Sequence, residues 1–253
     1  MYQKLKSTLR NHISTEWLQR NELWLRAVYV RYFVAKGDCR CPICGHALKS
    51  FLPIEKGELL CPACGSGKRH RRLFLLLRRE LSSQNIGSIL DFSPNKGFHH
   101  YAKKLFGALY QTTNFDPTDK TDFHFDITRI ESPDDRFDLI FCYHVLEHIP
   151  EDIQAMRELF RILKSGGCCY IQTPFKEGAI YEDATIVTPE DRLKHFEQED
   201  HVRIYSVDGL THRLKSVGFL VDILHYQSSR NPEEAKKYGF KDEEFIIRAK
   251  KPY

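Results

Sequence analysis

The pattern of hydrophobic and polar positions divides the chain into two regions. In residues 1–37, apolar residues recur at helical spacing from Leu5 through Trp17 to Phe33, which predicts one or two amphipathic helices. From about residue 86, short apolar runs alternate with helix-like segments. This alternation is typical of an α/β fold with a doubly wound, mostly parallel sheet.

The predicted strands and helices of the second region follow one another along the chain. Strands are expected in IGSILDFS, ALYQTTNFD, TDFHFDI, RFDLIFCYHV, CCYIQTPF, FLVDILHY and EEFIIRAK. Helices are expected in KGFHHYAKKLFG, PEDIQAMRELFRILKSGG and VDGLTHRLKSVGF, the last of which ends at a glycine. A polar insertion without a clear period occupies about residues 175–206. Ligands of open α/β sheets bind beyond the carboxyl ends of the strands, so we expect the chemistry there.

Four cysteines lie between the two regions as two CPxCG knuckles, Cys41 with Cys44 and Cys61 with Cys64, separated by sixteen residues. This spacing brings four thiolates together around one metal ion, and the glycine after each knuckle permits the turn. A four-thiolate site has no open position for water, so we expect a structural Zn²⁺ ion. A redox pair and an iron site are the alternatives. We assign no chemistry to Cys39, Cys142, Cys168 and Cys169.

Composition and charge add to this division. The hydrophobic content of 42% and the charged content of 28% exclude disordered and collagen-like chains. Residues 1–80 hold 16 Lys and Arg against 6 Asp and Glu, so the front of the chain is basic. A basic surface attracts nucleic acid or another anion, but it can equally be a solvated helix face. The same two readings apply to the basic run Arg69, His70, Arg71 and Arg72, which would suit a phosphate or form a charged linker.

Neither a membrane span nor a signal peptide is indicated. No run approaches the roughly 18 apolar residues of a membrane span, and MYQKLKSTLR has no apolar core. We therefore expect no membrane partner and a cytoplasmic location. The predicted organisation is a helical segment over residues 1–37, a zinc ribbon over 38–68 and a sheet domain over 69–253.

Polar residues recur where the predicted strands end. Asp91 ends the first strand, Asp116 the second and Asp126 the third. A carboxylate after the second strand can accept two hydrogen bonds from ribose hydroxyls, and nucleoside cofactors select an acid there for this reason. The fourth strand ends in a dense polar group of Tyr143, His144, Glu147 and His148.

At these residues the chain resembles the class I S-adenosylmethionine-dependent methyltransferases, in the branch called methyltransferase type 11. The resemblance covers about residues 86–250 and rests on ILDFSPNKG, NFD, FHFDIT, FDLIFCYHVLEHIP, MRELFRILKSGG and the closing GF. It implies a Rossmann-like methyltransferase domain over 69–253 and S-adenosylmethionine as cofactor. The CPxCG ribbon and the following basic segment look like a variant of this family.

The resemblance also implies a cofactor site. Asp91 and the following turn would hold the methionine part, Asp116 the ribose, and Tyr143 would lie under the sulfonium. The loop departs from the family's Gly-x-Gly-x-Gly pattern, because Ser93 and Asn95 replace two glycines. The complete set of predicted cofactor residues is Asp91, Phe92, Ser93, Gly97, Asp116, Asp126, Ile127 and Tyr143, with Asp126 and Ile127 beside the adenine.

Methyl transfer to an alcohol or phenol needs a group that removes a proton. The predicted bases are His144, His148 and His201. The first two share a helical face only if the strand ends by Tyr143, in which case Glu147 lies next to both. Relatives place elements that cover the substrate after the fifth strand, so the insertion is predicted to contact it through Tyr181, Arg203 and Tyr205.

Three functions are consistent with these residues. The first is methyl transfer to a small-molecule or sugar-containing acceptor. The second is methylation of RNA that the ribbon and the basic front would hold. The scarcity of aromatic residues in the ribbon argues against this function. The third is a zinc-stabilised interaction protein on a degenerate methyltransferase fold, which the two missing glycines motivate.

Overall fold

The computed structural model of the chain describes residues 14–54, 57–83, 85–240 and 243–253. Within this part of the chain, no helix is long and apolar enough to cross a lipid bilayer. The residues form two compact units, which we describe separately. The first unit contains the described part of residues 1–84 with Asn95–Leu105 and Gln227–Glu243, and the second contains Asn85–Pro94, Phe106–Tyr226 and Glu244–Tyr253.

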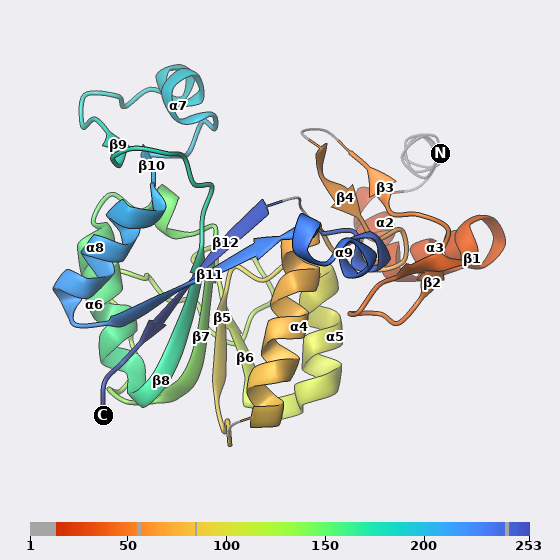
Figure 1. The fold of residues 1–253 in the computed structure, drawn as a ribbon, viewed down its shortest axis with the longest axis horizontal. Helices are drawn as coiled ribbons and strands as arrows, with labels where there is room; N and C mark the ends of the chain where they lie inside the picture. Colours follow the sequence, from red (N-terminus) through yellow and green to blue (C-terminus); the bar gives the residue numbers. More distant parts are fainter. Residues whose placement is uncertain (1–13, 55–56, 84, 241–242) are drawn as a thin grey trace. The chain divides into compact units, whose positions relative to one another are not determined.

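A six-stranded sheet forms the centre of the second unit (Figure 1). Its strands are β5 Ile89–Phe92, β6 Tyr110–Thr113, β7 Phe137–Tyr143, β8 Leu163–Gln172, β11 Leu220–Gln227 and β12 Glu243–Lys250. The spatial order is β11-β12-β8-β7-β5-β6, in which β5, β6, β7 and β8 run parallel and β12 runs antiparallel to β8. The predicted α/β class with a mostly parallel sheet is therefore confirmed, and the chain order reverses between β5 and β7.

One face of this sheet packs against helices α6 Asp152–Ile162 and α8 Val207–Val217, which lie side by side (Figure 1). Alternate strand residues face the helices, as the two-residue period of a strand requires. This apolar core explains the strand pattern, and the expected glycine stop is confirmed because Gly218 ends α8 at φ +115°. Buried core residues from the sheet and helices include Leu90, Ile140, Ile171, Ile247, Met156, Leu159 and Leu214.

The third predicted strand, TDFHFDI, is wrong. Only Phe123 pairs with the sheet, in an isolated parallel bridge to Thr113. The reason is local, because the carboxylate of Asp122 accepts hydrogen bonds from the amide (2.9 Å) and hydroxyl (3.0 Å) of Thr112. The Asp122 side chain thus accepts the hydrogen bond that the amide of Thr112 would otherwise donate to the backbone of a further edge strand.

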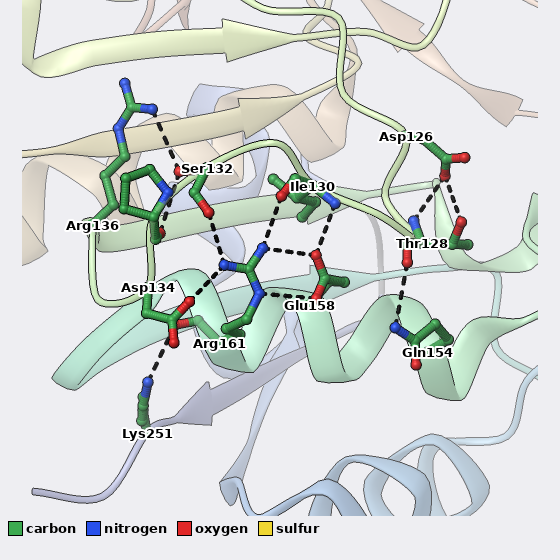
Figure 2. Close-up of polar contacts among 11 residues, drawn as sticks. Asp126, Thr128, Ile130, Ser132, Asp134, Arg136, Gln154, Glu158, Arg161 and Lys251 are labelled. Atoms are coloured by element: carbon green, nitrogen blue, oxygen red, sulfur yellow. Dashed lines mark hydrogen bonds and ion pairs between the residues drawn. The ribbon is translucent and has the colours of Figure 1, made fainter.

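Arg161 of α6 ties the segment after this bridge to the helix (Figure 2). Its guanidinium donates to the carbonyls of Ile130 (2.8 Å) and Ser132 (2.7 Å) and pairs with Asp134 (2.7 Å) and Glu158 (2.8 Å). These carboxylates raise the pKa of Arg161. The loop that replaces the third strand is therefore held by charged hydrogen bonds.

The insertion of the second unit contains regular structure that its sequence did not reveal. It forms strand β9 Tyr181–Glu182, helix α7 Pro189–Phe196 and strand β10 Arg203–Ile204, and β9 pairs antiparallel with β10. Thr188 caps the N-terminus of α7, because its hydroxyl oxygen accepts a hydrogen bond from the backbone amide of Asp191 (3.1 Å). Short 3-10 turns form at η3 Gly107–Leu109, η4 Leu146–His148 and η5 Ser228–Arg230.

The first unit combines short helices with small two-stranded sheets. The predicted N-terminal helices are confirmed over residues 15–29, whereas Leu5, Leu9 and Ile13 lie outside the described residues. The predicted boundary at residue 68/69 stays a prediction. The elements are α2 Thr15–Arg20, α3 Glu22–Tyr29, the π-helix η1 Val30–Val34, β1 Ala35–Arg40, β2 Ala47–Leu48, β3 Leu52–Pro53, β4 Leu59–Leu60, α4 Lys68–Ser83, α5 Lys96–Phe106 and α9 Pro232–Tyr238.

Candidate active site and cysteine cluster

The four knuckle cysteines come together in the first unit, as their spacing predicts. The sulfur atoms of Cys41 and Cys64 lie 3.7 Å apart, and so do those of Cys44 and Cys61. Four sulfurs at the usual Zn–S distance of about 2.3 Å lie about 3.8 Å apart in a tetrahedron. The cluster therefore has the dimensions of a four-thiolate metal site.

Both knuckles use the same backbone turn. The amide of Gly45 donates to the carbonyl of Cys41 (2.9 Å), and the amide of Gly65 donates to that of Cys61 (2.8 Å). Both glycines adopt positive φ, +76° and +75°, which glycine reaches without strain. This turn explains why each knuckle ends in glycine.

The basic run after the ribbon is not an open anion site. Arg71 is fully buried and donates to four backbone carbonyl groups, while Arg72 is buried with its guanidinium 3.5 Å from the ring centre of Phe240. The phosphate interpretation is wrong for these two residues, because both side chains are buried against other protein groups. Sequence reasoning could not foresee this, since charge alone does not distinguish a buried arginine from an exposed one.

Gly97 has a packing role within the first unit. A Cβ atom at Gly97 would lie 2.0 Å from the carbonyl oxygen of Cys64, so only glycine fits where α5 meets the second knuckle. Asn95 caps α5, because its side-chain oxygen accepts the amides of Gly97 (3.0 Å) and Phe98 (3.3 Å). The predicted cofactor role of Gly97 stays a prediction.

In the second unit, the ends of three parallel strands meet at one edge of the sheet. Phe92 pairs with Thr113 on one side and with Cys142 on the other, so β5, β6 and β7 end side by side. The hydroxyl of Ser93 donates to the side chain of Asn114 across this edge (3.3 Å). This is the switch point at which open α/β sheets bind ligands.

Asp91 and Phe92 lie just inside this edge and are buried. The hydroxyl of Tyr110 donates to the carboxylate of Asp91 at 2.5 Å. Burial raises the pKa of Asp91 to about 7, and the Tyr110 hydrogen bond opposes this shift. Asp91 therefore ends β5 as a carboxyl group held in a fixed orientation.

Ser93 adopts a left-handed conformation, with φ at +51°. This is the position where the family pattern has its first glycine, so serine replaces the residue but keeps the glycine conformation. A left-handed residue other than glycine costs about 1–2 kcal/mol, which makes the turn a strained part of the edge.

We expect Ser93→Gly to raise the free energy of unfolding by about 0.5–1 kcal/mol, because glycine removes the strain but adds chain entropy to the unfolded state. Urea unfolding followed by circular dichroism measures the change. The control is Ser50→Gly at an exposed loop position without positive φ, which is expected to lower stability slightly. A lower stability for Ser93→Gly than for the unsubstituted protein would contradict the strain argument.

Asp116 and Asp126 are exposed and lie in similar turns. In each, one carboxylate oxygen accepts the amide and hydroxyl of a threonine two residues later, Thr118 or Thr128, at 2.7–2.8 Å. These hydrogen bonds lower the pKa of Asp116. Its second oxygen has no hydrogen bond among the described residues, which leaves it open to a ligand, whereas Ile127 is buried beside the edge.

Strand β7 ends at Tyr143, and His144 follows it directly. The Tyr143 hydroxyl is buried without a hydrogen-bond partner in the described chain, and burial raises its pKa well above the usual value. His144 adopts φ +56°, and its Nε2 lies 3.0 Å from Oε1 of Gln172. A buried unpaired hydroxyl and a left-handed histidine at a strand end are typical of a ligand site.

Glu147 was expected to lie next to His144 and His148 if the strand ended by Tyr143, and β7 does end there. Nδ1 of His144 lies 3.1 Å from Oε1 of Glu147, and Glu147 also lies beside His148 and His201. The connection is a 3-10 turn rather than an α-helix. Burial and the neighbouring His148 lower the pKa of His201.

The predicted substrate residues differ in exposure. Tyr181 is exposed, and its hydroxyl lies 2.7 Å from Nδ1 of His195. Tyr205 is fully buried and donates to Asp152 at 2.5 Å, and its contact with substrate stays a prediction. The aromatic ring of Tyr205 packs in the core, and its hydroxyl satisfies the buried carboxylate of Asp152.

Arg203 is buried and holds the insertion to the turn after β7. It donates to Glu182 (2.8 Å) and to the carbonyls of Ile149 and Pro150 (2.9 Å for Pro150). It also lines a hollow of about 620 Å³, together with Asp152 and other residues. Sequence reasoning missed Gln172, which ends β8 and meets His144 only in the folded sheet. It also missed Asp152, which begins α6 and belongs to no motif.

Residues 66–223 match the family model described as "Methyltransferase domain". The tRNA U34 carboxymethyltransferase of Wolinella succinogenes is 27% identical over 148 residues, which cover 52% of this chain and 51% of that protein. The chain thus spans about half the length of this curated relative.

Two solved structures show similar arrangements. A SAM dependent methyltransferase from Archaeoglobus fulgidus is 16% identical, with a TM-score of 0.49 over 72% of this chain and 94% of that one. The [4+2]-cyclase SpnF is 19% identical, with a TM-score of 0.49 over 72% of this chain and 81% of that one.

Proposed function

Since the chain belongs to the methyltransferase domain family, we propose that it transfers the methyl group of S-adenosylmethionine to a small-molecule or sugar-containing acceptor. The observation that carries the proposal is the sheet edge where β5, β6 and β7 end side by side. This edge gathers Asp91, Ser93 and Tyr143, and Asp116 follows β6 by three residues. We also propose that the four-cysteine cluster holds a structural Zn²⁺ ion.

The residues of the edge fit a nucleoside cofactor. The free carboxylate oxygen of Asp116 suits ribose hydroxyls, and the unpaired hydroxyl of Tyr143 offers a donor in a buried place. Bound S-adenosylmethionine supplies an electrophilic methyl group on a sulfonium. We assign the methionine part to Asp91, Phe92, Ser93 and Gly97, the ribose to Asp116, the adenine to Asp126 and Ile127, and the sulfonium region to Tyr143.

We place the proton acceptor at His144. It directly follows Tyr143, and Glu147 lies 3.1 Å from its Nδ1, where a carboxylate stabilises the protonated ring. Its Nε2, now 3.0 Å from Gln172, would take the proton of an acceptor hydroxyl. For His148 and His201, which lie beside Glu147, we propose a different role.

RNA is a second candidate acceptor. The tRNA U34 carboxymethyltransferase relative favours it. The structure supports it less, because Arg71 and Arg72 are buried and cannot hold a phosphate backbone. RNA binding that weakens steeply as salt rises would favour this second candidate over a small acceptor.

We expect S-adenosylmethionine and S-adenosylhomocysteine to bind with micromolar affinity, and Asp116→Ala to weaken both by about tenfold to a hundredfold through loss of the ribose hydrogen bonds. Isothermal titration calorimetry measures the affinities. The matched control is Asp183→Ala, because Asp183 makes the same threonine turn with Thr185 outside the sheet edge. If neither ligand binds to the folded protein, an interaction protein on a methyltransferase fold becomes the better explanation.

A further inference from the structure

A second group of metal-ligating side chains lies in the turn after β7. One potential ligand atom each from Glu147, His148 and His201 lies within 4.8 Å of the others. Glu147 is 1% exposed and His201 is 3% exposed. Among the described residues, Oε1 of Glu147 lies 3.1 Å from Nδ1 of His144, whereas Oε2 of Glu147 and Nε2 of His201 take part in no hydrogen bond.

The imidazole rings of His148 and His201 are each held in place by a contact at Nδ1. Nδ1 of His201 lies 3.1 Å from the carbonyl oxygen of Phe196, so Nδ1 is the protonated nitrogen and Nε2 carries a lone pair. Nδ1 of His148 lies 3.2 Å from the carboxylate of Asp200. Histidines that bind metals are held in this way, with one ring nitrogen on a carbonyl or carboxylate and the other on the ion.

The backbone joins the three ligands. The amide of Val202, next to His201, donates to the carbonyl oxygen of Glu147 at 2.9 Å. The rings of His148 and His201 lie 4.7 Å apart in an edge-to-face arrangement. The insertion therefore delivers His201 to a turn that already carries Glu147 and His148.

A buried carboxylate oxygen without a hydrogen bond is strongly destabilising unless a cation lies beside it. His144 contacts one oxygen of Glu147 at 3.1 Å but leaves the second oxygen and Nε2 of His201 unsatisfied. A single positive ion between the three side chains would satisfy all of these atoms.

We propose that Glu147, His148 and His201 bind a divalent transition-metal ion, such as Mn²⁺ or Zn²⁺, separate from the four-cysteine cluster. Two imidazoles and one carboxylate suit such ions. Donor atoms around a tetrahedral ion at about 2.1 Å lie about 3.4 Å apart, so ligand atoms that lie within 4.8 Å of one another need only a local inward movement to bind one ion. Three protein ligands leave positions open for water or a substrate oxygen.

Mn²⁺ is the probe that tests the site, because it prefers oxygen and nitrogen ligands to the thiolates of a zinc-loaded cysteine cluster. Zinc-loaded protein is titrated with MnCl₂, and the electron paramagnetic resonance signal of free Mn²⁺ is followed. We expect one Mn²⁺ per chain, with affinity weakened at least tenfold by Glu147→Gln and by His201→Ala. The matched control is His195→Ala, in the same insertion but outside the cluster, which is expected to bind as the unsubstituted protein does.

Thermal melting by circular dichroism separates loss of the site from loss of the fold, and Glu147→Gln keeps the side-chain volume if His201→Ala does not fold. The proposal is overturned if folded, unsubstituted protein binds no Mn²⁺. It is also overturned if the folded Glu147→Gln variant binds Mn²⁺ with unchanged affinity, or if His195→Ala weakens binding equally. None of these readouts depends on S-adenosylmethionine, so failure of this proposal is distinct from failure of the proposed function.

Discussion

Replacing Cys64 by serine is expected to abolish metal binding at the cysteine cluster and to unfold the ribbon around it. Three thiolates bind an ion far more weakly than four, and structural Zn²⁺ contributes roughly 10–16 kcal/mol to the folding of small zinc domains. Cys64 also ties the cluster to its surroundings, because its sulfur lies 3.1 Å from the hydroxyl of Ser66 and its carbonyl oxygen lies against Gly97. The loss is therefore expected to spread to α4 and α5.

Co²⁺ substitution measures this effect, because the sulfur-to-cobalt charge-transfer absorption reports thiolate ligands and does not arise at the Glu147, His148 and His201 site. We expect the band to disappear in Cys64→Ser, together with amide exchange protection over residues 57–83. The control is Cys39→Ser, which lies two residues before Cys41 and outside the cluster. A Cys64→Ser variant that keeps both the band and the protection would show that the cluster is not a four-thiolate site.

The sequence was sufficient for most of the sheet because its strands are buried on a regular pattern. Ile89–Phe92 and Phe137–Tyr143 read as strands since nearly all their side chains are buried. The prediction of the third strand failed because an alternating pattern does not reveal that the Asp122 side chain accepts the hydrogen bond of the Thr112 amide. Local polar competition of this kind depends on atomic positions rather than on residue type.

The candidate site was predictable where one motif carries it, and less so where the fold assembles it. His144, Glu147 and His148 lie within five residues, so their proximity followed from the end of the strand. His201 belongs to the insertion. Its residue type indicated a candidate base, but the sequence did not indicate that it lies beside Glu147 and His148. The burial of Tyr205, four residues further on, could not be predicted, because a tyrosine in a polar segment does not reveal that its hydroxyl donates to a buried Asp152.

The cysteine knuckles were predictable for the same reason as the fourth strand end, since the ligands are paired closely in sequence. Their surroundings were not, because residues 227–243 join the cysteine-containing unit from between β11 and β12. Gly239 illustrates this, since a Cβ atom there would lie 2.4 Å from the ring of Phe51. A close approach between residues so distant in sequence leaves no local signal.

Arg71 is the residue that connects these distant segments, and Arg71→Met is expected to lower the free energy of unfolding of this unit by about 4 kcal/mol or more. Its guanidinium donates to the carbonyls of Leu59 (3.0 Å), Ser66 (2.7 Å), Tyr238 (2.5 Å) and Gly239 (2.6 Å). Each buried carbonyl left without a donor costs about 1–3 kcal/mol, and methionine supplies no donor. The carbonyl of Ser66 keeps the amide of Cys61 as a donor (2.9 Å), so the loss falls mainly on the other three carbonyls.

The charge of Arg71 contributes as well as its hydrogen bonds. Burial lowers the pKa of Arg71, and the nearby cysteine sulfurs oppose this shift because negative charge there favours the protonated guanidinium. The side chain also stacks on Phe51, with 4.0 Å from the guanidinium carbon to the ring centre. Arg71→Lys keeps the charge but loses the planar fork, so we expect an intermediate destabilisation.

Both tryptophans of the chain, Trp17 and Trp24, lie in this unit, so guanidinium unfolding followed by tryptophan fluorescence reports on it selectively. The matched control is Arg78→Met in the same helix, because Arg78 is exposed and its replacement is expected to change stability by less than about 0.5 kcal/mol. Equal effects of the two substitutions would mean that the carbonyl contacts of Arg71 do not hold α9 to the ribbon. A large effect for Arg71→Met alone, with Arg71→Lys between the two, would identify the buried guanidinium as the link that joins the ribbon, α4 and residues 227–243 into one folded unit.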